Sequence, residues 1–179
     1  AFVPTMILGF IFYHFIKKYL LASEQVVLWS LFVGGIFLIL FELIHRESES
    51  AVGEIAQISY KHAALIGVFQ AIAMIPGVSR SAATICGGLI LGVRRKAIVE
   101  FSFLLAVPTM LAATTLDLIK NAHSFSAGQT EFLLTGFISA FVVALLSIRF
   151  LLYFIKNHSF ITFGIYRISI VLLFWFFLK

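Results

Sequence analysis

The chain has 179 residues, of which 61% are hydrophobic and 12% are charged, and its mean hydropathy is +1.08. This composition leaves too little polar surface for a soluble domain of that size, so a bilayer must be the solvent. The net charge is +5, but the basic residues gather at the ends of apolar blocks, which indicates contact with lipid headgroups and argues against a nucleic-acid partner.

Five apolar blocks are long enough to cross about 30 Å of hydrocarbon as helices. They cover residues 1–20, 26–44, 97–119, 132–155 and 160–178. We therefore expect an all-α integral membrane protein, a polytopic helical bundle that forms a single transmembrane domain over residues 1–179.

A different pattern separates the second block from the third. A polar loop over residues 45–59 is followed by an apolar stretch, 61–93, which Pro76-Gly77 interrupts at its middle. Proline removes a backbone donor and glycine permits non-helical dihedrals, so we predict a break at Pro76 and a new helix from Ser79 or Ser81. Each half is too short to span the membrane alone. We expect a re-entrant helix pair, although the basic residues fit a broken spanning helix equally well.

Arg80 is the central candidate within this break. An arginine inside an apolar stretch costs several kcal/mol unless it is paired or hydrated, which favours a functional role. Its planar fork suits bidentate binding of a phosphate. Ser79, Ser81 and Thr84 add hydroxyls at helical spacings that would let one oxyanion contact several of them, and the amides at the helix start add donors. For either serine alone, simple helix capping is an equally good interpretation.

Other polar residues are weaker candidates. Gly77 and Gln70 could contribute to substrate binding, although an amide in a membrane helix more often bonds to a neighbouring helix. Four carboxylates in or beside the polar loop are expected to be solvated: Glu42, Glu47, Glu49 and Glu54. None of the histidines or carboxylates has the spacing of a metal site.

The string from Pro76 to Thr84 resembles the PGxSRSxxT motif of the undecaprenyl-diphosphate phosphatases, also called bacitracin-resistance proteins. Residues 100–108 are similar to that family's next helix. The resemblance implies a bacterial inner-membrane, multi-pass enzyme that removes the terminal phosphate of a polyprenyl diphosphate and so recycles the lipid carrier of cell-wall synthesis. It also implies that Arg80 binds the diphosphate and that Ser79, Ser81 and Thr84 position or attack it.

An earlier motif of such proteins, an acidic E/QxxxE pair followed by a serine-rich turn and a histidine, has no match in residues 1–59. The resemblance therefore implies that this chain corresponds to the C-terminal two-thirds, without the half that is related to it by an inverted repeat. A divalent cation, Mg²⁺ or Ca²⁺, would then have ligands outside this chain.

Two other classes of function stay open at this stage. A transporter or flippase could bind a polyprenyl-phosphate headgroup at the broken helix without chemistry, since transporters use discontinuous helices in this way. A non-catalytic partner protein is the third alternative. Polyprenyl diphosphate and membrane lipids are the expected partners, and a homodimer is also compatible with the sequence.

Overall fold

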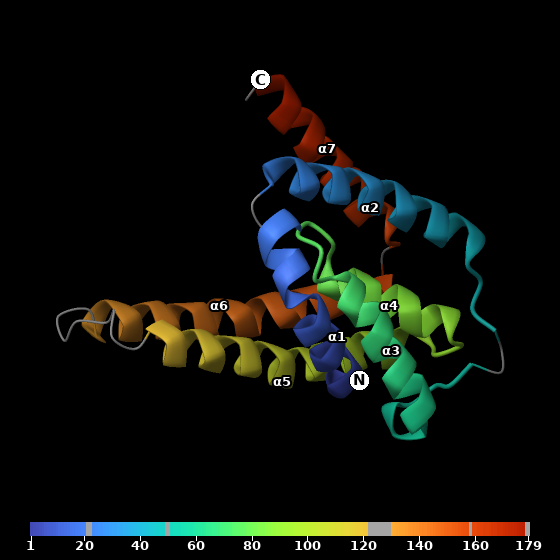
Figure 1. Cartoon of the computed structure of the whole chain (residues 1–179). Helices are drawn as coiled ribbons and strands as arrows, with labels where there is room; N and C mark the ends of the chain where they lie inside the picture. Colours follow the sequence, from blue (N-terminus) through green and yellow to red (C-terminus); the bar gives the residue numbers. More distant parts are fainter. Residues whose placement is uncertain (21–22, 49–50, 122–129, 158, 178–179) are drawn as a thin grey trace. The chain divides into compact units, whose positions relative to one another are not determined.

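The computed structural model describes residues 1–20, 23–48, 51–121, 130–157 and 159–177, and these are almost entirely helical (Figure 1). The element order is α1 (Phe2–Phe15), the π-helix η1 (Ile16–Leu20), α2 (Glu24–Ile44), the 3₁₀-helix η2 (Ile55–Gln57), α3 (Tyr60–Ile72), α4 (Arg80–Ile90), α5 (Arg95–Asn121), α6 (Thr130–Asn157) and α7 (Ile161–Phe177). No strand occurs within the described ranges. The predicted all-α class is confirmed.

Among the described residues, three helices are long and apolar enough to cross a membrane: α2, α5 and α6. Two of the five predicted spans are shorter helices, since α7 has 17 residues and α1 has 14 before the chain continues as η1. The basic residue Lys18 lies within η1, where the apolar block gives way to polar residues. Large apolar side chains are exposed along these helices, as lipid contact requires. The chain is a multi-pass membrane protein.

The predicted break in the middle of the chain is present. Helix α3 has 13 residues and α4 has 11, so they are about 20 Å and 16 Å long, too short to span. Residues 73–79 between them are non-helical. Whether this pair is re-entrant or spans as a broken helix stays a prediction.

The described residues divide into two compact units. The first comprises Ala1–Leu105 and Ser159–Lys179, and the second comprises Ala106–His158. In the first unit α2 packs against α7, α1 against α3, and α3 against α4 (Figure 1). The prediction of a single transmembrane domain is not decided by this division.

Glycines allow the close helix contacts of the first unit. A Cβ added to Gly35 of α2 would lie 2.9 Å from the carbonyl oxygen of Gly164 in α7, so the two backbones touch. On α4, a Cβ at Gly87 would lie 2.5 Å from Phe69 of α3, and one at Gly88 would collide with Ile98. The small residues of α4 therefore allow close packing.

Helix α4 is the most enclosed element of this unit. Its residues 84–89 are all buried, and Val93 directly after it is 1% exposed. The polar loop also reaches this point, because Val52 donates to Gly92 O (2.9 Å) and accepts from the Arg94 amide (2.9 Å). Irregular backbone at membrane depth is tolerated only inside protein or beside a wet cavity, and the buried end of α4 with the following turn meets the first of these conditions.

Candidate anion-binding site

The turn between α3 and α4 depends on Gly77. This residue has φ +89°, a conformation that side chains rarely adopt, and a Cβ there would lie 2.5 Å from Val27 O of α2. The Val78 amide donates to Ile75 O at 3.1 Å and closes the turn. Glycine is therefore required both for the dihedral and for the close approach of α2.

Ser79 caps the new helix, as the simpler interpretation predicted. Its Oγ accepts from the Ala82 amide at 3.2 Å and lies 3.1 Å from Ser81 Oγ. The amides of the first helical turn lack intrahelical acceptors and carry the positive end of the helix dipole. An anion placed at this end would meet several aligned donors.

Arg80 occupies the first position of α4, at this same end. Its side chain is half-buried, and its Nη1 is shielded from solvent yet has no hydrogen-bond partner among the described residues. A buried guanidinium nitrogen without an acceptor is costly, because it has lost water and gained nothing in exchange. The geometry thus leaves a charged donor available for an anionic ligand.

Thr84 does not share this exposed end. It is fully buried, and its Oγ1 lies 3.0 Å from Arg80 O, 3.0 Å from Ser81 O and 2.6 Å from Ser102 Oγ of α5. The expectation that one oxyanion contacts Arg80, Ser81 and Thr84 together is therefore corrected. Thr84 supports the turn from inside the protein, and its catalytic role stays a prediction.

Gln70 lies on the side of α3 that faces α1. Its Nε2 donates to Thr5 Oγ1 at 3.0 Å, and Thr5 donates to Gly67 O at 2.8 Å. The residue is 1% exposed, and its Oε1 has no partner in the described part of the chain. This contact between helices is the alternative that the sequence favoured, and substrate binding by Gln70 stays a prediction.

Arg167 was missed by the sequence analysis. It lies within apolar α7, and its Nη2 donates to Gly77 O at 2.7 Å, directly on the turn that precedes Arg80. The rule that identified Arg80, a charge inside an apolar block, also applies to Arg167 and would have found it.

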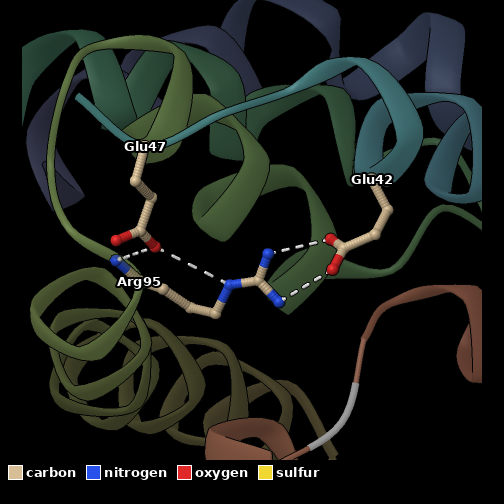
Figure 2. Close-up of polar contacts among 3 residues, drawn as sticks. All are labelled: Glu42, Glu47 and Arg95. Carbon is tan, nitrogen blue, oxygen red and sulfur yellow. Dashed lines mark hydrogen bonds and ion pairs between the residues drawn. The ribbon is translucent and has the colours of Figure 1, made fainter.

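Glu42 was also misjudged, because it is not solvated. Arg95 at the start of α5 donates to both of its carboxylate oxygens (3.1 and 2.9 Å), and only 14% of the Glu42 side chain is exposed. The Arg95 amide donates to Glu47 at 3.1 Å (Figure 2). The Arg95 guanidinium also lies over the ring of Phe160. Glu49 lies outside the described residues.

The divalent cation implied by the resemblance has no fitting ligand set here. The described residues contain no group of three or more histidine, cysteine or acidic side chains that could hold a metal ion. Glu42 and Glu47 are both paired with Arg95, which lies between them (Figure 2). No chemical step below is therefore assigned to a metal.

A cavity of about 610 Å³ adjoins the turn. Its walls are largely apolar and come from α2, α3, α4 and α7, with Ser30, Ser79 and Arg167 as polar lining residues. This volume falls within the range of about 300–1,000 Å³ that is typical of small-molecule sites. The arrangement suits a ligand with an apolar body and an anionic end.

Comparison with known proteins agrees with this geometry. The family described as bacitracin resistance protein BacA matches residues 1–173. An undecaprenyl-diphosphatase of Sulfurihydrogenibium sp. (strain YO3AOP1) is 51% identical over 175 residues, which cover 98% of this chain and 69% of that protein. The undecaprenyl-diphosphatases of Aquifex aeolicus and Persephonella marina are 49% and 51% identical, each over 97% of this chain and 68% of their own length.

Proposed function

Because this chain belongs to the bacitracin resistance protein BacA family, we propose that it hydrolyses undecaprenyl diphosphate to the monophosphate and inorganic phosphate. The relatives reported above carry this activity in their names and are similar over nearly the whole chain. The reaction returns the lipid carrier to cell-wall synthesis, and we place the protein in the bacterial inner membrane.

The observation that carries the proposal is the position of Arg80. Arg80 is the first residue of α4 and stands between Ser79 and Ser81 in the sequence. Its Nη1 is shielded from solvent and has no hydrogen-bond partner among the described residues. A terminal phosphate at this helix end would accept two hydrogen bonds from the guanidinium and more from the first-turn amides. These contacts strengthen as negative charge shifts during phosphoryl transfer.

The bond changes follow from the products. Water attacks the terminal phosphorus, and the bond from that phosphorus to the bridging oxygen breaks. The lipid monophosphate leaves with the electron pair of that bond. The positive charge of Arg80 stabilises the charge on the terminal phosphate as it is transferred to water. Ser79 and Ser81 position the terminal phosphate, and Thr84 acts by holding the turn that carries Arg80.

Replacement of Arg80 tests this role. Arg80→Lys keeps the positive charge but loses the bidentate fork, so we expect phosphate release from undecaprenyl diphosphate in detergent to fall by about tenfold to a hundredfold. Arg149→Lys is the matched control, because Arg149 is an exposed arginine of α6 in the second compact unit. Full turnover by Arg80→Lys would contradict the proposed phosphate contact.

The same assay separates hydrolysis from the transporter alternative. A transporter or flippase would bind the lipid diphosphate at the turn and release no phosphate from it. Tight binding of undecaprenyl diphosphate without phosphate release would therefore replace the phosphatase proposal with that function.

A further inference from the structure

Arg167 of α7 carries a charge that no described carboxylate balances. No carboxylate among the described residues forms an ion pair with it, and its one hydrogen bond there goes to Gly77 O. A guanidinium has five N–H donors, so four remain after this contact. A charged side chain inside an apolar helix is energetically costly. A neutral donor could make the hydrogen bond to Gly77 O without that cost, so this bond alone does not account for an arginine here.

The backbone of α2 makes room for this side chain. A Cβ added to Gly34 would lie 2.7 Å from Arg167 Nη1, so any larger residue would displace the guanidinium. The bond to Gly77 O and the contact with Gly34 together fix the guanidinium on the turn. A preorganised fork binds a phosphate with less loss of entropy than a mobile side chain would.

The cavity indicates which phosphate Arg167 can reach. Arg167 lines the 610 Å³ cavity together with apolar residues of α2 and α4 and with Ser79, the residue that precedes Arg80. In a lipid diphosphate, the phosphate attached to the prenyl chain lies between the apolar tail and the terminal phosphate. A tail in the cavity would bring this first phosphate to Arg167 and the terminal one to the start of α4.

We propose that Arg167 binds the lipid-proximal phosphate of the substrate, while Arg80 binds the terminal phosphate. This assignment rests on the proposed phosphatase function, since it concerns the same site. Arg167 would then determine the specificity for lipid phosphates, whereas Arg80 would bind the phosphate that is removed.

Three probes test the assignment without requiring hydrolysis: undecaprenyl monophosphate, undecaprenol and inorganic phosphate. Trp29 lines the cavity and is one of only two tryptophans in the chain, so tryptophan fluorescence in detergent reports binding there. The ratio of the Kd for undecaprenol to the Kd for undecaprenyl monophosphate measures the contribution of the lipid-proximal phosphate alone.

We expect Arg167→Lys to lower this ratio by about tenfold, because a lysine cannot replace the bidentate contact, and to leave the Kd for undecaprenol unchanged. Arg167→Gln, which keeps a donor for Gly77 O without the charge, should lower it at least as much. Arg80→Lys should leave the ratio nearly unchanged but weaken the binding of inorganic phosphate. Arg149→Lys again serves as the control for an arginine outside the site.

The outcomes separate binding from a purely structural role. Equal weakening of both lipids in the Arg167 variants would show that this residue only supports the turn, and would overturn the assignment. A wild-type protein that binds the monophosphate no better than undecaprenol would overturn it as well. If the ratio behaves as expected while the wild-type protein releases no phosphate, the assignment stands and the proposed hydrolysis fails.

Discussion

Thr84 connects the anion-binding end of α4 to α5 through a hydroxyl that is wholly enclosed. A hydroxyl has one hydrogen to donate, and the carbonyls of Arg80 and Ser81 can only accept, so Thr84 donates to them. The 2.6 Å contact with Ser102 then requires Ser102 to be the donor. A chain of hydrogen bonds thus runs from α5 into the turn that carries Arg80.

Removal of either hydroxyl tests this chain. Thr84→Val keeps the shape but leaves the Ser102 hydroxyl without its acceptor, so we expect a loss of about 1–3 kcal/mol in the free energy of unfolding. Ser102→Ala should cost about 1 kcal/mol, since Thr84 keeps its carbonyl acceptors. Thermal denaturation in detergent measures both losses. The double variant should lose less free energy of unfolding than the sum of the two single losses. A loss equal to that sum would show that the two hydroxyls are not coupled.

The site residues that were predictable share a local signature. Arg80 and Ser79 follow Pro76-Gly77, so a break, a charge and a cap are all visible in a few consecutive letters. The pairing of Glu42 with Arg95 has no such signature, because 53 positions separate the two residues. Only the fold brings the end of α2 to the start of α5, and a carboxylate beside a polar loop is ordinarily solvated.

At the scale of elements, the turn between α3 and α4 combines two separate demands on Gly77. The positive φ alone is unfavourable for any residue with a Cβ, and the nearby carbonyl of Val27 adds a steric demand. Gly92, at the end of α4, has a similar φ of +80° but no atom within 4 Å of an added Cβ. The two glycines therefore allow dihedral strain to be separated from collision.

We expect Gly92→Ala to lower stability by about 1 kcal/mol, the cost of the left-handed backbone. Gly77→Ala should cost clearly more and should also reduce phosphate release, because α2 or the turn must move away from the new methyl group. Thermal denaturation of both variants in detergent measures the difference. Equal losses of stability would mean that α2 does not press on the turn as described.

The existence of the helices was predictable, whereas some of their ends were not. Long apolar runs and the break at Pro76 depend on composition and on local backbone chemistry. The shift from α1 to the π-helix η1 depends on packing and on residues near the block end. Hydropathy measures how apolar a segment is, and it does not report where its hydrogen-bond pattern changes.

At the scale of the whole molecule, Arg95 joins segments that are far apart in the sequence. It binds Glu42 at the end of α2 and Glu47 in the polar loop (Figure 2). Its guanidinium also lies over the ring of Phe160, directly before α7. Helices in lipid gain little from apolar contact with one another, since lipid tails are equally apolar. Polar contacts at helix ends therefore have a larger share in fixing their arrangement.

The two carboxylates should differ in importance. Glu42 forms a bidentate pair and is 14% exposed, whereas Glu47 is 41% exposed and its carboxylate lies 3.8 Å from Arg95 Nε. We expect Glu42→Gln to lower the free energy of unfolding by about 1.5–3 kcal/mol, the range for charge-assisted hydrogen bonds. Glu47→Gln should cost about 0.2–1 kcal/mol, as for exposed pairs. Added salt should remove the effect of Glu47→Gln and spare that of Glu42→Gln, because water and ions screen the exposed pair far more. Thermal denaturation of both variants in detergent, at low and at high salt, measures these losses. If the two variants lose the same stability and salt reduces both losses equally, then Glu42 is as solvated as its position beside the polar loop first suggested.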